Sequence, residues 1–321
     1  MSAAQTEARL IHVAAGVISD ASGRVLVAKR PERAHQGGLW EFPGGKLEPG
    51  ELVERGLARE LDEELGVRVT ASQPLIRLHH DYGDRHVLLD IRRVTGFEGS
   101  PTGREGQPLD WILPDAMDPA QFPAADRPVI SALRVPNRYL ITGREPETPH
   151  AFVERLDRVL SSTEVRMVQL RAPWLDEDRF KALATRCIEV CRRAGARLIL
   201  NCEPRLAAEL PCDGLHLSEA RLRRLQERPW LDRMLIGASC HDPSALARAA
   251  ELGLDYALLS PVQPTSSHPK ATALGWRRFA ALVDTAFVPV FALGGVGDED
   301  LKTAISLGAQ GVAGIRAYWG D

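Results

Sequence analysis

The sequence has few cysteines, no long hydrophobic run and almost no net charge. Its five cysteines are odd in number and lie in apolar or helical segments. Cys187 and Cys191 are one helical turn apart without a second such pair, so we interpret them as small buried thiols rather than metal ligands. A net charge of −3 gives no electrostatic reason to expect DNA or an anionic membrane as a partner.

Segments that would direct the chain to a membrane are also lacking. No apolar run approaches the roughly 18 residues of a membrane helix. Residues 1–9 lack the hydrophobic core of a signal peptide. We therefore expect a cytoplasmic protein with no membrane partner. At 321 residues, of which 44% are hydrophobic, the chain is long enough to form two domains.

A short acidic segment, residues 52–65, has the pattern of an amphipathic helix. It follows a Pro49-Gly50 turn and ends before Gly66, a residue suited to the left-handed conformation that closes helices. Its apolar side chains recur every four residues and predict a face packed on a core: Leu57, Leu61 and Leu65. Three carboxylates fall together on a neighbouring face: Glu60, Glu63 and Glu64.

These carboxylates repel one another, at a cost of about 0.2–0.5 kcal/mol per pair in an isolated helix. Glu63 and Glu64 alone would be interpreted as an ordinary solvated acidic face. However, hard oxygen ligands clustered in this way suit Mg²⁺ or Mn²⁺. A polyphosphate could approach such a cluster only with divalent cations in between. The pattern therefore favours a metal-dependent site for a phosphate ester.

The same segment matches the Nudix box, G-x5-E-x7-R-E-U-x-E-E-x-G-U, in which U is a bulky aliphatic residue. Every specified position is filled: Gly45, Glu51, Arg59, Glu60, Leu61, Glu63, Glu64, Gly66 and Val67. The first half is thus identified as a member of the Nudix family. The resemblance implies hydrolysis of a nucleoside diphosphate linked to a further group. It also implies an α/β/α sandwich, with Mg²⁺ as the cofactor and Mn²⁺ as its substitute.

Outside the box, the similarity narrows to the MutT branch of the family, which removes 8-oxo-dGTP and so keeps oxidised guanine out of DNA. It covers about residues 11–134 and rests on residues 40–46, 84–86, 103–108 and 122–128. The resemblance implies that water attacks the β-phosphorus, releasing a nucleoside monophosphate and pyrophosphate. The implied metal ligands are the Gly44 carbonyl, Glu63, Glu64 and Glu105, with Glu60 as a further ligand or base. The implied substrate contacts are Arg30 on phosphate and, around the nucleotide, His35, Glu41, Phe42, Pro43, Gly44, Arg85 and Asp126.

Three of these roles have alternatives. Glu105 could be a solvated loop charge, and His35 an ordinary hydrogen-bonding group. Asp126 stands where MutT enzymes have an asparagine that reads the oxidised base. A carboxylate accepts well from the N7–H of 8-oxoguanine, but it donates to O6 only when protonated. Asp126 also precedes Arg-Pro-Val-Ile-Ser, where it would cap a helix. We expect selectivity for 8-oxo-dGTP, with related nucleoside triphosphates as further substrates.

The second half has a different sequence pattern, in which short apolar segments alternate with helical ones. The expected strands are residues 139–142, 165–170, 197–200, 214–217, 235–238, 256–259, 288–293 and 311–315. Eight strands separated by helices predict a compact (β/α)₈ TIM barrel. We place a Nudix domain at residues 1–134, a polar join at 135–138 and the barrel at 139–321.

This half resembles the thiamine-phosphate synthase and TenI family. The resemblance rests on residues 139–142, 168–171, 213–217, 239–241, 260–265, 292–295 and 308–313. Barrel ligands sit at the C-terminal ends of strands. The implied site for a phosphorylated small molecule comprises Arg171, Asn201, His216, His241, Gly294 and Gly295, with Lys270 as a cation on the phosphate side.

Several residues that the synthase pattern uses for catalysis are replaced in this sequence. Cys202 and Arg221 stand where the pattern has two metal-binding aspartates, and Pro173 replaces a lysine. The TenI tautomerase histidine, which would fall near Pro261, is also missing. Without both aspartates, departure of a Mg²⁺-pyrophosphate lacks its main electrostatic support. We expect a degenerate ligand-binding or accessory barrel. The alternative is a thiamine-pathway enzyme whose Nudix half acts on pathway pyrophosphates.

Overall fold

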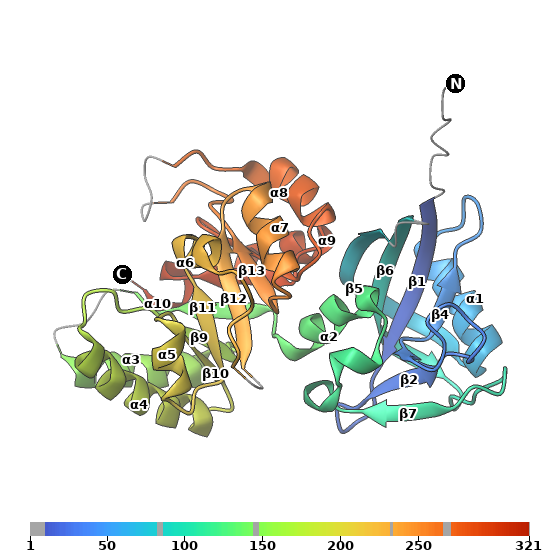
Figure 1. Cartoon of the computed structure of the whole chain (residues 1–321), viewed down its shortest axis with the longest axis horizontal. Coiled ribbons are helices and arrows are strands. Elements are labelled where there is room, and N and C mark those ends of the chain that lie inside the picture. Colours follow the sequence, from blue (N-terminus) through green and yellow to red (C-terminus); the bar gives the residue numbers. More distant parts are fainter. Residues whose placement is uncertain (1–9, 82–85, 144–147, 232–233, 266–270, 321) are drawn as a thin grey trace. The chain divides into compact units, whose positions relative to one another are not determined.

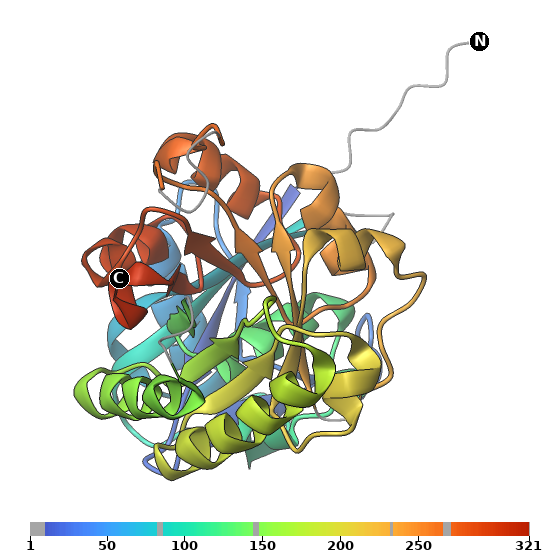
Figure 2. The same cartoon turned by 90° about the vertical axis from the view of Figure 1, so that its left-hand side faces the viewer.

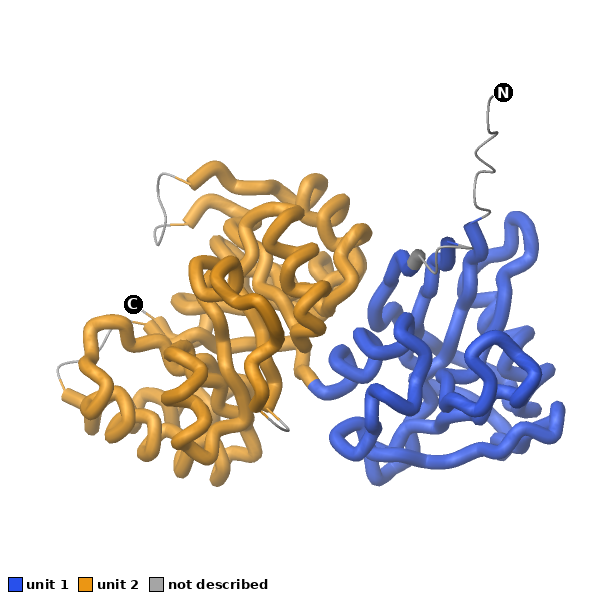
Figure 3. The backbone as a smooth tube through the Cα atoms, in the orientation of Figure 1, with its two compact units in different colours: residues 1–134 blue, residues 135–321 orange. Residues whose placement is uncertain are grey.

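The chain divides into two compact units, Met1–Arg134 and Val135–Asp321 (Figure 3). The structure, a computed structural model, describes residues 10–81, 86–143, 148–231, 234–265 and 271–320. The segment that we predicted as a join belongs to the second unit. Val135 is 4% exposed in the barrel core, and Arg138 begins the first barrel strand.

The first unit contains two small sheets. Its strands are β1 (Leu10–Ile18), β2 (Val25–Lys29), β3 (Trp40–Glu41), β4 (Gly44–Lys46), β5 (Arg68–Asp81), β6 (His86–Glu98) and β7 (Leu109–Ile112). One sheet has the order β4-β1-β6-β5, with β1 and β6 parallel and the other pairs antiparallel. The other has the order β3-β2-β7 and is antiparallel throughout.

Two helices pack on this framework, as the predicted mixed α/β architecture requires. Helix α1 (Val53–Leu65) and helix α2 (Arg127–Arg134) lie on opposite sides of the sheet that contains β1 (Figure 1). The predicted leucine stripe of α1 is fully buried: Leu57, Leu61 and Leu65 are each 0% exposed. Truncating a leucine buried in this way to alanine typically costs about 2–5 kcal/mol of stability. Gly66 closes α1 in the left-handed region, with φ of 71°.

The second unit is a closed barrel of eight strands in which every neighbouring pair is parallel (Figure 2). The strands are β8 (Arg138–Ile141), β9 (Met167–Leu170), β10 (Arg197–Leu200), β11 (Gly214–Leu217), β12 (Leu235–Cys240), β13 (Tyr256–Leu259), β14 (Val290–Leu293) and β15 (Gly311–Gly314). The predicted TIM barrel is therefore confirmed.

Helices follow the strands and cover the outside of the barrel. They are α3 (Pro149–Ser162), α4 (Glu177–Arg193), α5 (Pro204–Ala208), α6 (Glu219–Arg224), α7 (Pro243–Glu251), α8 (Gly275–Asp284), α9 (Leu301–Ser306) and α10 (Arg316–Trp319). Several begin with a side-chain cap, such as Asp176 on α4 and Asp242 on α7. The barrel interior is filled by large side chains that include Tyr139, Tyr256 and Phe291.

The five cysteines are free and buried, as predicted. Four of them have a thiol pKa that burial raises to about 12 or beyond, which keeps them neutral and unreactive: Cys187, Cys191, Cys202 and Cys240. Within the described residues, no helix combines the length and hydropathy needed to cross a membrane.

Candidate active site and barrel pocket

Two glycines let the loop before α1 lie directly against its carboxylates. Gly44 has φ of 148°, and a Cβ added there would lie 2.2 Å from the Ala14 carbonyl oxygen. A Cβ added to Gly45 would lie 2.2 Å from a carboxylate oxygen of Glu60. A larger residue at Gly44 would therefore displace the chain from β1, and one at Gly45 would displace the Glu60 carboxylate.

Glu64 lies at the centre of the predicted metal site. The Gly44 backbone N–H donates to its Oε2 at 3.1 Å. Burial raises the pKa of Glu64 to about 7, and the negative charges of Glu41, Glu105 and Glu60 raise it further against the effect of the Gly44 hydrogen bond. These four carboxylates come from three separate stretches of the chain and lie near enough for their charges to act on Glu64.

Arg59 organises the other acidic residues of the box. Its guanidinium contacts Glu60 Oε1 at 2.8 Å and Glu63 Oε2 at 3.4 Å. It also holds both carboxylate oxygens of Glu51, at 3.1 and 3.0 Å, and donates to the Lys46 carbonyl. The box arginine thus fixes Glu51 against the helix and partly neutralises the like charges that the sequence places together.

A second loop brings Glu105 to the same end of α1. The Arg104 backbone N–H and the Gln107 side-chain amide both donate to the Glu64 carbonyl, at 2.9 and 3.2 Å. The Glu105 N–H donates in turn to Gln107 Oε1 at 2.9 Å. The Glu105 side chain is exposed and acts electrostatically on Glu64 and Glu41. The assignment of Glu105 as a metal ligand therefore stays a prediction, with a solvated loop charge as its alternative.

Within the described residues, no three His, Cys, Asp or Glu side chains converge tightly enough to hold a metal ion as they stand. Arg59 draws Glu60 and Glu63 to one side, while Glu64 is held by Gly44. The donor set nevertheless suits Mg²⁺, because it consists of hard carboxylate oxygens around a desolvated Glu64 whose neighbours are also negative. A divalent cation would relieve that repulsion.

The predicted nucleotide-binding residues gather beside this cluster. Arg30 forms an ion pair with Glu41 and donates to the His35 carbonyl at 3.0 Å. Asp126 is 8% exposed, and burial raises its pKa to about 8, with Glu41 raising it further and Arg30 opposing the shift. Asp126 ends the short helical turn Ala124–Asp126 and directly precedes α2, so a helix cap remains the alternative role for its carboxyl group.

Phe42 and Phe122 form the apolar wall of this region. Their rings stack with centroids 5.8 Å apart and an interplanar angle of 29°. Sequence analysis included Phe122 only as part of the similar segment 122–128 and did not predict that it packs against Phe42. Pro43 joins Phe42 to Gly44, and its carbonyl accepts from the Gly16 N–H at 2.8 Å. Arg85, which we also predicted here, lies outside the described residues.

In the barrel, the predicted ligand residues lie at or next to the C-terminal ends of strands. Arg171 follows β9, Asn201 follows β10 and His241 follows β12. Gly294 and Gly295 follow β14 with φ of 92° and 67°. A cavity of about 650 Å³ opens here and is lined by residues that include His241, Ser260, Gly294, Gly295, Glu299 and Arg316. Lys270 lies outside the described residues.

His216 takes a different position from the other predicted ligand residues. It is 0% exposed inside the barrel, where its Nε2 lies 2.9 Å from Ser239 Oγ and its Nδ1 lies 3.4 Å from the Tyr256 hydroxyl. Burial, followed by the charges of Arg221 and Arg171, lowers the pKa of His216 to about 3. The ring is therefore neutral at physiological pH. It is buried beneath the barrel mouth, where it contacts Ser239 and Tyr256.

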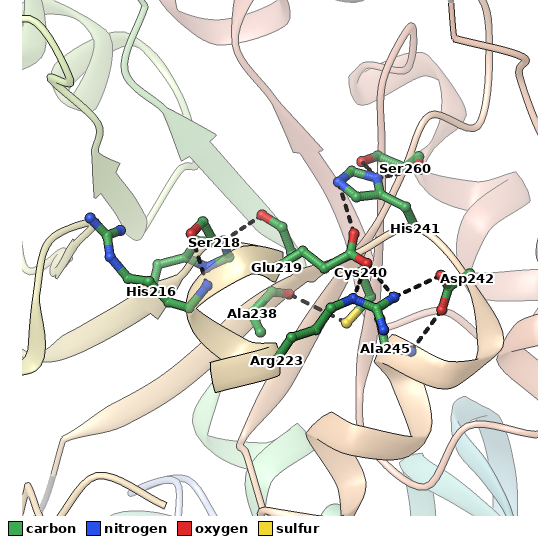
Figure 4. Close-up of polar contacts among 12 residues, drawn as sticks. His216, Ser218, Glu219, Arg223, Ala238, Cys240, His241, Asp242, Ala245 and Ser260 are labelled. Carbon is green, nitrogen blue, oxygen red and sulfur yellow. Dashed lines mark hydrogen bonds and ion pairs between the residues drawn. The ribbon is translucent and has the colours of Figure 1, made fainter. Parts of the chain in front are cut away.

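Two neighbours of His241 were not predicted from the sequence. Its Nδ1 lies 2.8 Å from the Ser260 carbonyl oxygen, and its Nε2 lies 3.7 Å from Glu219 Oε2 (Figure 4). Glu219 also accepts from Arg223, which pairs with Asp242 at 2.8 Å. These residues come from three strand–helix junctions, which the parallel pairing of β11, β12 and β13 brings together.

Comparison with known proteins agrees with this division. The NUDIX domain family matches residues 14–132, and the family described as thiamine monophosphate synthase matches residues 138–318. The chain belongs to both families. The first unit is a Nudix pyrophosphohydrolase, and Nudix hydrolases generally use a divalent metal ion, typically Mg²⁺. The second unit is a barrel of the thiamine monophosphate synthase family.

Three relatives illustrate the two similarities. An 8-oxo-dGTP diphosphatase from Proteus vulgaris is 47% identical over 96 residues, which are 30% of this chain and 86% of the relative. A CTP pyrophosphohydrolase from Escherichia coli (strain K12) is 36% identical over 126 residues, 39% of this chain and 91% of the relative. A putative thiamine-phosphate synthase 2 from Aquifex aeolicus (strain VF5) is 31% identical over 186 residues, 58% of this chain and 99% of the relative.

Proposed function

We propose that the first unit hydrolyses 8-oxo-dGTP to its monophosphate and pyrophosphate, and thereby keeps oxidised guanine out of DNA. The observation that carries this proposal is the position of Asp126, buried beside Arg30 and Glu41 and next to the carboxylates around Glu64. A buried group able to read a base thus shares a neighbour, Glu41, with a carboxylate cluster suited to the triphosphate.

Some residues of the site would bind the metal ion, and others would bind and orient the nucleotide. Glu60, Glu63, Glu64, Glu105 and the Gly44 carbonyl would hold Mg²⁺, with Mn²⁺ as a substitute. When bound, the ion lowers the pKa of water and neutralises charge on the phosphate oxygens. Arg30 meets a phosphate oxygen, and the Phe42 region lines the pocket. Water attacks the β-phosphorus, and the bond from that phosphorus to the bridging oxygen of the nucleoside monophosphate breaks.

Asp126 supplies the base selectivity in this proposal. Because its pKa is raised to about 8, its carboxyl group is largely neutral near pH 7. A neutral carboxyl group has one O–H donor and one C=O acceptor, as the side-chain amide of asparagine has one acceptor and N–H donors. It can accept from N7–H of 8-oxoguanine and donate to O6. Guanine has no hydrogen on N7, so it leaves the acceptor without a partner.

Hydrolysis of a nucleotide panel by the full-length protein tests this assignment. Pyrophosphate release is measured at submicromolar 8-oxo-dGTP, dGTP and CTP in Mg²⁺. We expect kcat/KM for 8-oxo-dGTP to exceed that for dGTP by at least about 10²-fold, since sites built around a hydrogen bond reject analogues that cannot form it. Equal values for the two guanine nucleotides would contradict the proposed selectivity. A preference for CTP would assign the site to pyrimidine nucleotides instead.

For the barrel, we propose an accessory or ligand-binding role rather than thiamine-phosphate synthesis. The full-length protein is expected to form no thiamine phosphate above background from the pyrimidine diphosphate and the thiazole phosphate, with Mg²⁺ present. The reason is that Cys202 and Arg221 supply no carboxylate for the metal. Product is measured by fluorescence after oxidation to the thiochrome. Robust turnover would support the thiamine-pathway alternative.

A further inference from the structure

A chain of hydrogen bonds runs from the barrel interior to its mouth. The hydroxyls of Tyr139 and Tyr256 lie 2.9 Å apart, and the Gln169 side-chain amide donates to Tyr139 at 3.2 Å. Asn201 Nδ2 donates to Gln169 Oε1 at 2.9 Å, and Arg221 Nη1 donates to Asn201 Oδ1 at 3.0 Å. The first three residues are at most 1% exposed. A satisfied buried network of this kind holds the last members in one orientation.

Arg221 is therefore anchored while it faces the mouth. Its Nε donates to Glu203 Oε1 at 2.7 Å, and its side chain is 23% exposed. Within the described part of the chain, these contacts occupy Nε and Nη1 and leave Nη2 for a ligand. Arg221 belongs to α6, which is capped by Ser218, whose Oγ accepts from the Arg221 backbone N–H. Both the backbone and the side chain of Arg221 are thus positioned.

A second arginine, Arg171, lies at the same end of the barrel, two strands away. Arg171 follows β9, and its backbone N–H donates to the buried Thr142 hydroxyl at 2.9 Å. Its side chain is exposed. Burial, and then the charges of Arg221 and Arg171, lower the pKa of His216 on β11. Two permanent positive charges therefore act on the same part of the barrel mouth.

The magnesium ion that the barrel's family resemblance implies does not fit these residues. Cys202 is 6% exposed, and burial raises its thiol pKa to about 12, so it provides no anionic ligand. Arg221 places a positive charge where the second aspartate would stand, and it repels a cation. The neighbouring carboxylate of Glu203 is already paired with Arg221. We therefore derive no step that involves a metal ion in the barrel.

We propose that the barrel mouth over β9, β10 and β11 is an anion site that works without a divalent cation, in which Arg221 and Arg171 bind the phosphate group of a small molecule. A guanidinium group offers parallel N–H donors that match two phosphate oxygens, and it stays charged at any physiological pH. The hydrogen-bonded network holds Arg221 in place before the ligand arrives. This inference is independent of the nucleotide substrate of the first unit.

Calorimetric titration of the full-length protein with inorganic pyrophosphate tests the proposal. The titration is made in excess EDTA, which removes the divalent ions that the first unit needs. We expect one saturable site whose dissociation constant rises at least tenfold in Arg221→Gln. The matched control is Arg224→Gln, which removes an exposed arginine from the same helix and should bind as the unchanged protein does. Absence of binding in EDTA, or equal binding by Arg221→Gln, would overturn the proposal.

Two further variants keep the test decisive. If Arg221→Gln lowers the thermal midpoint, Arg171→Gln provides the same comparison, because its side chain is exposed and its backbone contacts are retained. The double variant Cys202→Asp with Arg221→Asp should lose binding in EDTA and recover it when Mg²⁺ is added. That titration is made in a Glu64→Gln background to suppress the first unit. A double variant that still binds in EDTA would also overturn the proposal.

Discussion

Replacing Glu64 with glutamine (Glu64→Gln) is expected to lower kcat for nucleotide hydrolysis by about 10²–10³-fold, the size of effect seen when one preorganised electrostatic group is removed. The substitution keeps the acceptor oxygen for the Gly44 N–H but removes the charge at the centre of the carboxylate cluster. Because the same burial disfavours that charge in the absence of metal, the fold should be no less stable. Pyrophosphate release in saturating Mg²⁺ and a thermal unfolding curve measure both effects.

The matched control is Glu54→Gln, on the first turn of the same helix. Glu54 is 59% exposed and pairs with Arg92 at 3.0 Å, away from the cluster around Glu64. It should retain the turnover of the unchanged protein. If Glu64→Gln also retained full turnover in saturating Mg²⁺, Glu64 would have no role in holding the ion.

Replacing Asp126 with alanine (Asp126→Ala) is expected to lower the ratio of kcat/KM for 8-oxo-dGTP over dGTP by about 10–100-fold, since a paired donor–acceptor contact with a base contributes about 1–3 kcal/mol of discrimination. The loss should fall on 8-oxo-dGTP, because only the oxidised base satisfies both groups of the neutral carboxyl. Steady-state kinetics with both nucleotides measure the ratio. An unchanged ratio would leave Asp126 with a structural role alone.

Asp126→Asn is the informative companion to this variant, because an amide retains a donor and an acceptor at every pH. Burial raises the pKa of Asp126 to about 8, so the neutral donor form is present below that pH and is lost as pH rises through it. The selectivity of the unchanged protein should therefore fall between about pH 7 and pH 9, while that of Asp126→Asn stays level. Parallel pH profiles for the two proteins would contradict the proposed donor.

The two phosphate sites that we propose have opposite electrostatic arrangements. The first gathers carboxylates around Glu64, so it can meet a polyphosphate only through an intervening cation. The second places Arg221 and Arg171 at its mouth and has a neutral Cys202 nearby. EDTA should therefore separate the two ligand sites within a single chain.

The local sequence pattern was sufficient to predict those elements whose residues repeat with the period of a helix or strand. The leucine stripe and the terminal Gly66 of α1 were both read from the sequence, because helical periodicity and a left-handed stop are local properties. The alternation of short apolar strands with helices likewise predicted the closed barrel. Its strand ends then indicated where ligand residues such as Asn201 and His241 would lie.

Strand β5 was not predicted, although it is the longest strand of the first unit. It contains Pro74, and its register with β6 shifts at three points, between Val69 and Ala71, Ala71 and Ser72, and Pro74 and Ile76. These irregularities interrupt the two-residue alternation by which a strand is recognised. Pairing with β6, rather than local pattern, holds β5 in the sheet.

By itself, the sequence determined the two families, the acidic helix and the barrel, because each follows from spacing along the chain. Only the tertiary structure decided the electrostatic state of the sites. The pKa of Asp126 is raised because the fold buries its carboxyl group, and Arg221 is fixed because Asn201 and Glu203 meet it across strand ends. Burial and charge are sums over neighbours in space, and most of those neighbours are far apart in the sequence.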